Sequence, residues 1–167
     1  DVSTKIAQLL SCRYVITSVI QDLYGIEYCA VMKNIIALAC GLARGLSYGD
    51  NFQAVVVSNA MQEIHRFIDA VHPGIRDMNS SAYLGDLLVT CYSPHSRNRT
   101  LGYMVGKGYS VREAMTEMNM IAEGYFAVSC VHELNKKYNV NMPITKTVFN
   151  VLYEKISPVM EMRILEN

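Results

Sequence analysis

Three consecutive residues, Ser96, Arg97 and Asn98, could bind an anionic phosphoryl group. They follow Pro94, which should break a preceding helix, and serine is a favoured N-terminal cap for the next one. If a helix restarts there, its free N–H groups, the hydroxyl, the amide and the guanidinium all converge on one point. Asp86 adds a carboxylate upstream. The alternative is a capped surface helix with solvated arginines.

Lys33 also suggests chemistry, because it lies in the almost continuously apolar residues 27–43. Its neighbours three and four positions away on a helix are Cys29, Ala30, Ile36 and Ala37. None of these can pair with an ammonium, so Lys33 either extends to solvent or is held in a pocket for acid–base work. Asn34 beside it needs hydrogen-bond partners. With Asp86, these residues would supply a base and a charged partner next to a phosphate-binding helix start.

The elements that must position these residues are predicted to be helices. Helices are expected over residues 3–10, 27–43, 51–71, 86–91, 97–106, from 111, over 123–137 and 143–155, and from Pro158, with a loop over 75–81 and a break between 119 and 124. Asp50 with Gln53, and Ser110 with Glu113, fit capping boxes. The one candidate strand is the run 13–17. The sequence therefore predicts an all-α domain with a small helix–strand stub in front.

Composition narrows the possible classes of function. The chain has 167 residues, 51% of them hydrophobic, which is enough for one domain with a large core. Its formal net charge is +0, so neither a nucleic-acid partner nor a basic membrane-binding surface is indicated. No apolar run is expected to reach the ~20 residues that span a bilayer. The chain starts at Asp1, inside a predicted amphipathic helix, and is expected to be a piece of a longer protein.

The cysteines and histidines favour a cytoplasmic protein without a metal site. The cysteines are scattered without a paired spacing, which is typical of reduced thiols in a cytosol: Cys12, Cys29, Cys40, Cys91 and Cys130. The four histidines do not approach them at metal-ligand spacing. A nucleophilic Cys91–His95 pair is a much less favoured alternative.

Several motifs, in this order and spacing, resemble the NAD(P)-dependent glycerol-3-phosphate dehydrogenases. They are GIEYCAVMKN at 25–34, GLSYGDN at 45–51, GDLLVTC at 85–91, SPHSRN at 93–98 and AEG at 122–124. The family joins an N-terminal dinucleotide-binding α/β domain to an all-helical substrate domain of the 6-phosphogluconate dehydrogenase C-terminal-like type. The resemblance implies that residues 1–20 are the tail of an absent first domain and that residues 21–167 form the substrate domain.

The resemblance also implies roles for individual residues. Lys33 matches the proton acceptor and also binds substrate, and Asp86 matches a residue at the substrate. The residues Ser96, Arg97 and Asn98 match the substrate-binding run. Arg97, Ile121 and Glu123 match contacts to the cofactor, NAD or NADP. Thr90, one turn after Asp86, is an expected neighbour of the site. The implied reaction interconverts glycerol 3-phosphate and dihydroxyacetone phosphate and feeds glycerophospholipid synthesis.

Two features depart from the family pattern. Tyr83 stands where the family usually has a glycine, which questions how closely the backbone before Asp86 can approach a ligand. In addition, no Gly-x-Gly-x-x-Gly run follows a strand, so the pyrophosphate-binding turn is missing. The isolated chain is therefore expected to be inactive without its first domain.

Two other interpretations remain open at the level of sequence. A related two-domain dehydrogenase could act on a different phosphorylated or carboxylated hydroxy acid. A helical dimerisation or interaction module without catalysis would instead use the ten methionines at an adaptable surface. The sequence does not determine the oligomeric state, and a homodimer remains open.

Overall fold

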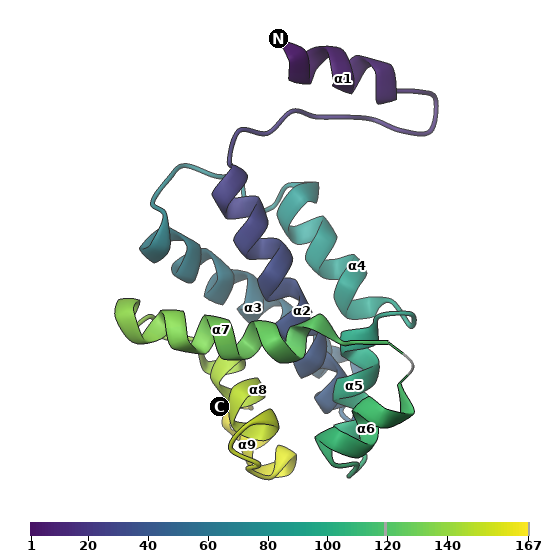
Figure 1. Ribbon diagram of the computed structural model, residues 1–167, viewed down its shortest axis with the longest axis vertical. Helices are drawn as coiled ribbons and strands as arrows, with labels where there is room; N and C mark the ends of the chain where they lie inside the picture. The colour runs from purple at the N-terminus through teal and green to yellow at the C-terminus, as the bar shows by residue number, and fades with distance from the viewer. Residues whose placement is uncertain (119, 167) are drawn as a thin grey trace.

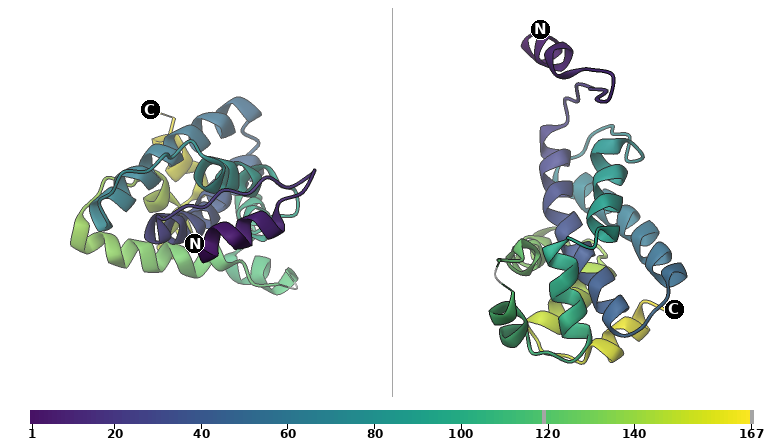
Figure 2. Two further views of the ribbon diagram at one scale, coloured as in Figure 1. Left: turned by 90° about the horizontal axis from the view of Figure 1, so that it is seen from above. Right: turned by 90° about the vertical axis from the view of Figure 1, so that its right-hand side faces the viewer.

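The computed structural model describes residues 1–118 and 120–166. A long central helix, α2 (Leu23–Gly45), is surrounded by shorter helices, while α1 (Val2–Leu10) stands away from this body on an extended connection (Figures 1 and 2). The surrounding elements are α3 (Asp50–Val71), the π-helical turn η1 (Ser81–Gly85), α4 (Asp86–Tyr92), α5 (Arg97–Gly106), α6 (Val111–Glu117), α7 (Glu123–Tyr138), α8 (Pro143–Leu152) and α9 (Pro158–Ile164). The predicted all-α architecture is confirmed.

Helix α2 forms the core because its apolar residues face every direction. From Ile35 to Ala43 it is continuously buried, and helices α3, α4, α5, α7 and α8 all pack against it. By length and composition α2 could also cross a membrane, which corrects the expectation that no run is long enough. Within this fold, however, 61% of the apolar window is buried inside the protein. That burial is typical of a core helix.

Glycines allow α2 and α5 to pack with their backbones almost in contact. A Cβ atom at Gly41 would lie closer than 3.0 Å to the carbonyl oxygen of Arg99, and one at Gly102 would meet the carbonyl of Leu38 just as closely. Gly45 and Gly106 repeat this relation one turn further along. This close packing sets the beginning of α5 against the middle of α2, where Lys33 and Asn34 lie.

Most helix boundaries agree with the predicted caps. Ser96 accepts a hydrogen bond from the N–H of Arg99, and Ser110 and Glu113 form the expected capping box. At α3 the cap prediction is wrong: Gly49 is the N-cap without a side-chain bond, and Asp50 lies 3.6 Å from Arg44. Helix α8 ends at Leu152, before the predicted 155, since Lys155 adopts a positive φ. The predicted break at 119–124 includes Asn119, which lies outside the described residues.

The predicted strand over 13–17 is wrong. Among the described residues no strand forms, and this segment has only an isolated antiparallel bridge between Cys12 and Val15. The side chains of Tyr14 and Ile16 are 85% and 97% exposed. A β-branched run becomes a strand only beside a partner strand, and none lies next to this one.

Candidate functional site

Lys33 and Asp86 form an ion pair between two helices that are distant in sequence. The Nζ atom of Lys33 donates to Oδ2 of Asp86 at 2.6 Å, and the two side chains are 22% and 39% exposed. Lys33 projects from the middle of α2, and Asp86 is the first residue of α4. Lys33 is thus held by a partner, not merely extended to solvent, yet remains reachable from solvent.

The backbone before Asp86 fixes the position of its carboxylate. The N–H of Asp86 donates to the carbonyl oxygens of Ser81 and Tyr83, as the π-helical turn η1 passes into α4. Short π-helical turns are often found at functional sites. Thr90 lies one turn further on, and its hydroxyl donates to the backbone carbonyl of Asp86 at 2.7 Å. The hydroxyl proton of Thr90 is therefore engaged in a hydrogen bond within α4.

A chain of amide hydrogen bonds joins α2, α5 and α7 next to this pair. Nδ2 of Asn98 donates to Oδ1 of Asn34 at 2.9 Å, and the N–H of Gly124 donates to Oδ1 of Asn98 at 2.8 Å. Asn34 also donates to the carbonyl of Ala30. Gly124 permits the contact, because a Cβ there would lie 2.7 Å from the carbonyl oxygen of Asn34. Asn98 is only 7% exposed and holds the start of α5 in place.

Arg97 is the accessible cation at the start of α5. Its Nη2 atom lies 3.7 Å from Oε1 of Glu123, with side-chain exposures of 42% and 68%, so this pair is weak and Arg97 can change partners. Ser96 accepts the capping hydrogen bond and keeps its own hydroxyl proton free to donate. Ile121, which precedes Glu123 on the approach to α7, is 65% exposed.

Two cysteines near the pair are structural thiols. Burial raises the pKa of Cys29, one turn before Lys33, to about 11, and the charge of Asp86 acts in the same direction. The hydrogen bond with Cys40, together with burial, raises the pKa of Cys91 far above its usual range. Cys91 is fully buried and His95 is exposed, so the alternative of a nucleophilic Cys91–His95 pair is wrong.

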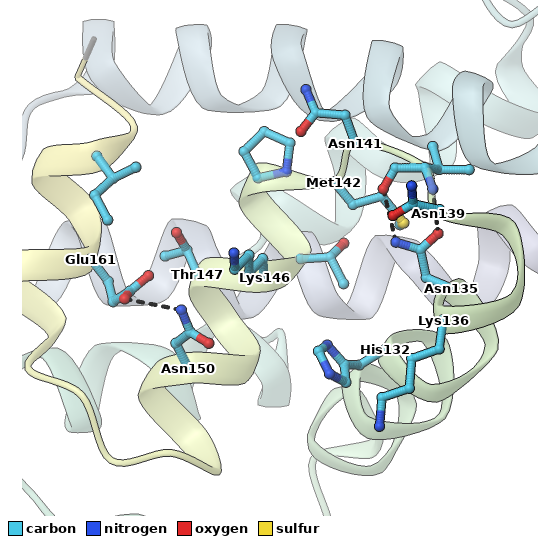
Figure 3. Close-up of a pocket in the computed structure, with 14 residues that line it drawn as sticks. His132, Asn135, Lys136, Asn139, Asn141, Met142, Lys146, Thr147, Asn150 and Glu161 are labelled. Carbon is cyan, nitrogen blue, oxygen red and sulfur yellow. Dashed lines mark hydrogen bonds between the residues drawn. The ribbon is translucent and has the colours of Figure 1, made fainter.

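A polar cavity lies elsewhere, between α7, α8 and α9 (Figure 3). It measures about 750 Å³, and some of its polar side chains have hydrogen-bond partners within the protein. Asn135 bonds both backbone groups of Val140, and Asn150 donates to Glu161 at 3.0 Å. These amides stabilise the connections between the helices that line the cavity.

The structure thus connects most of the predicted site residues through hydrogen bonds and ion pairs, whereas Ile121 is exposed and takes part in none of these bonds. Lys33, Asp86, Asn98, Arg97 and Glu123 are linked through α2, α4, α5 and α7 as described above. Sequence analysis did not identify the steric role of Gly124 or the hydroxyl contact of Tyr83 with Asp22 at 2.6 Å. The motif around 122–124 was a signal for the first, while the second depends on residues 61 positions apart.

This arrangement can move a proton and hold an anion side by side. An amine held by a carboxylate suits proton exchange with a hydroxyl, and an accessible guanidinium at a helix start suits a phosphate. Exposed Arg97, Glu123 and Ile121 offer charged and apolar contacts of the kind that a dinucleotide needs at the edge of its site. Among the described residues no three His, Cys, Asp or Glu side chains gather around a metal position.

Comparison with known proteins supplies the family. Residues 22–163 match the model described as the NAD-dependent glycerol-3-phosphate dehydrogenase C-terminus. A relative from Staphylococcus aureus (strain JH9), named glycerol-3-phosphate dehydrogenase [NAD(P)+], is 43% identical over 136 residues, which is 81% of this chain and 41% of the relative. One from Staphylococcus carnosus is 42% identical over 135 residues, with the same coverage.

Solved structures agree with this assignment. Glycerol-3-phosphate dehydrogenase from Coxiella burnetii superimposes with a TM-score of 0.92 and 30% identity, covering 99% of this chain and 51% of that protein. The enzyme from Saccharomyces cerevisiae gives 0.88 and 27% identity, covering 98% and 48%. The chain therefore spans less than half the length of the curated relatives described above, at 41%. Over that length it belongs to the family of NAD-dependent glycerol-3-phosphate dehydrogenase C-terminal domains.

Proposed function

We propose that this chain is the substrate-binding half of an enzyme that interconverts glycerol 3-phosphate and dihydroxyacetone phosphate with NAD or NADP. The observation that carries the proposal is the Lys33–Asp86 pair, open to solvent beside the helix start that presents Arg97. Family membership supports the reaction. The geometry offers Lys33 for proton transfer and Arg97 for binding the substrate phosphate.

Lys33 is the proposed acid–base group. As a neutral amine it would take the proton from the C2 hydroxyl during oxidation, and as an ammonium it would return that proton to the carbonyl oxygen during reduction. Asp86, at 2.6 Å, would hold the ammonium and keep it directed at the substrate oxygen. When bound, the nicotinamide supplies the hydride acceptor or donor at C2.

Arg97 and Ser96 are the proposed anchors for the substrate phosphate, with Asn98 holding the helix start in place. Binding a phosphate away from the reacting carbon contributes free energy that fixes C2 relative to Lys33. Asn98 reaches Asn34, the residue next to Lys33, so the same amide fixes the separation of the phosphate and proton-transfer positions. Arg97, Ile121 and Glu123 are the proposed cofactor contacts on this domain.

The N-terminal arm is the proposed junction with a dinucleotide-binding domain, for which residues 1–20 would form the tail. Its apolar side chains have no cover in this structure: Val2, Ile6, Leu9 and Leu10 are between 51% and 85% exposed. A preceding α/β domain would bury them and would supply the pyrophosphate-binding turn that this sequence lacks. We expect the chain alone to be inactive.

The proposed setting is the cytoplasm, with glycerol 3-phosphate passing on to glycerophospholipid synthesis. All five cysteines are free, as expected in a reducing compartment. A homodimer remains a prediction to be tested by the mass of the intact protein in solution.

Substrate choice by the intact protein tests the proposal. We expect oxidation of glycerol 3-phosphate, with glycerol and a non-phosphorylated 2-hydroxy acid turned over far more slowly at equal concentration. Preference for a carboxylated hydroxy acid would favour the related dehydrogenase instead. No turnover of any of these by the intact, cofactor-binding protein would leave a helical interaction module as the better explanation.

A further inference from the structure

A partly buried charged cluster lies at the N-terminal end of α2, opposite its glycine contacts with α5. The guanidinium of Arg76, whose side chain is only 2% exposed, donates from Nε to Oδ2 of Asp22 at 2.6 Å and from Nη1 to Oδ1 of Asp69 at 2.5 Å. Its Nη2 donates to the carbonyl of His72 at 2.9 Å. Arg76 therefore ties the end of α3 to Asp22, which is the N-cap of α2. The guanidinium holds the pKa of Asp22 far below its usual range.

Tyr83 connects this cluster to the candidate site. Its hydroxyl donates to the same Oδ2 atom of Asp22 at 2.6 Å, while its backbone carbonyl accepts the N–H of Asp86. The residue is 2% exposed and lies inside the π-helical turn that leads directly into Asp86. Tyr83 thus links the cap of α2, through its side chain, to the backbone N–H of Asp86, through its carbonyl.

Gly25 leaves the space that the cluster requires. A Cβ atom at this position would lie 2.7 Å from Cγ of Asp22 and 2.9 Å from the hydroxyl of Tyr83. The N–H of Gly25 also donates to Oδ1 of Asp22 at 3.0 Å. The carboxylate of Asp22 is consequently held by three donors from three segments of the chain.

We propose that Asp22, Arg76 and Tyr83 form a positioning cluster that fixes Asp86 relative to Lys33. Lys33 belongs to α2, whose first turn is held by Asp22, and Asp86 follows η1, which is held by Tyr83. The cluster therefore sets where α2 and α4 begin relative to one another. None of its members contacts the reacting groups, so they are positioning residues. The tyrosine that departs from the family glycine is accommodated as part of this cluster.

The inference rests on the proposed function, and Tyr83→Phe in the intact, cofactor-binding protein tests it. This variant removes only the hydroxyl, so we expect the protein to fold with a slightly lower Tm. We expect kcat to fall by about tenfold, a displacement of well under 1 Å being enough for such a loss. KM for glycerol 3-phosphate should change by less than about twofold, because the phosphate anchors are untouched.

Thr145→Val is the matched control. The hydroxyl of Thr145 also donates to a carboxylate at 2.6 Å, that of Glu63, and this bond joins α8 to α3 away from the residues proposed for the site. It should lower Tm comparably and leave kcat unchanged. If both variants lower Tm and both keep the kcat of the wild type, the hydroxyl of Tyr83 is merely structural and the proposal is overturned.

A second measurement separates this inference from the proposed function. Acylation of lysines by acetic anhydride, quantified by peptide mass spectrometry, reports how firmly Lys33 is held, with exposed Lys137 as the internal reference. We expect the Lys33-to-Lys137 labelling ratio to rise in Tyr83→Phe and to stay constant in Thr145→Val. An unchanged ratio in Tyr83→Phe overturns the positioning role even if the wild type is inactive. Inactivity of the wild type with the expected ratios would refute only the reaction.

Discussion

Two carboxylates in this chain join helices that are distant in sequence, and they do so in opposite ways. Glu63 on α3 is 0% exposed and accepts three hydrogen bonds, from the N–H groups of Ile144 and Thr145 and from the hydroxyl of Thr145, each at 2.6 to 2.8 Å. Asp86 is 39% exposed and meets the single ammonium of Lys33. Glu63 thereby caps α8, whose own N-cap residue, Met142, has no side-chain oxygen.

The difference lies in the donors. Backbone N–H groups at a helix start cannot leave, so Glu63 serves only the fold. The ammonium of Lys33 sits on a flexible stem that solvent can reach, so it can exchange its proton and its partner. The carboxylate proposed for the site is therefore distinguished by an exchangeable, accessible partner, whereas burial and the number of hydrogen bonds distinguish the structural carboxylate.

Replacing Lys33 should have the largest effect on catalysis. We expect Lys33→Met in the intact protein to lower kcat by about 10²–10⁴-fold, because it removes the proposed acid–base group. The free energy of unfolding should change by less than about 1 kcal/mol, since the pair is partly solvated. Steady-state kinetics and urea denaturation measure the two quantities.

Lys136→Met is the matched control for that experiment. Lys136 donates to Glu133 at the same 2.6 Å, but both side chains are 61% exposed and lie on α7. It should leave kcat unchanged. A Lys33→Met enzyme with the kcat of this control would refute the assignment of Lys33 as the acid–base group.

Replacing Glu63 should affect stability and spare catalysis. Glu63→Ala leaves two buried backbone N–H groups and a hydroxyl without partners, so we expect the free energy of unfolding to fall by about 3 kcal/mol. Activity per folded molecule should remain within about twofold, measured well below the transition. Glu133→Ala, at an exposed ion pair, should change stability by less than about 0.5 kcal/mol. A large loss of kcat in folded Glu63→Ala would erase the distinction between the two carboxylates.

Replacing Arg97 should have a smaller effect than replacing Lys33, and the effect should be on substrate binding. Arg97→Ala removes charge-assisted hydrogen bonds worth about 1.5–3 kcal/mol, which should raise KM for glycerol 3-phosphate by roughly 10- to 150-fold. KM for the cofactor should rise less, and stability should hardly change, because the contact with Glu123 is long and exposed. Unchanged KM values for both ligands would mean that Arg97 is only a solvated side chain.

Local patterns predicted much of this structure. Caps and breakers placed α5 at its observed bounds of Arg97–Gly106 and the start of α6 after Ser110. Lys33 could be identified because an ammonium on an apolar helix requires a polar partner or solvent. Asp86 could be identified because its carboxylate could be that partner. These inferences need only residues within one helix turn of each other, or the order of motifs in a family.

The remaining features depend on contacts that a single sequence does not reveal. Glu63 looks like one more polar residue of α3 until α8 folds back onto it, 81 positions later. Tyr83 appeared as a departure from a glycine pattern, and only the position of Asp22 shows what its hydroxyl does. The strand at 13–17 failed for the same reason, because strand formation requires a partner and the apolar run alone could not supply one.

The pH dependence of stability gives the smallest and most specific test of the comparison. Burial raises the pKa of Glu63, against the opposing hydrogen bonds from Thr145 and Ile144. Between the unfolded value near 4.3 and the raised native value, the folded state holds a proton that the unfolded state has lost. The free energy of unfolding therefore falls as pH rises through this window, and the contribution of Glu63 is fully present only below it.

Glu63→Gln isolates this contribution, because a glutamine does not titrate. The low pKa of Asp22 gives a slope of the opposite sign at more acidic pH, but it is common to both proteins and cancels in their difference. We expect the stability of the wild type minus that of Glu63→Gln to be greatest near pH 4 and to decline toward pH 8, measured by urea denaturation at each pH. A difference that grows with pH would mean that the three donors outweigh burial and hold Glu63 ionised. Only the accessibility of the partner would then separate Glu63 from Asp86, the carboxylate proposed for the site.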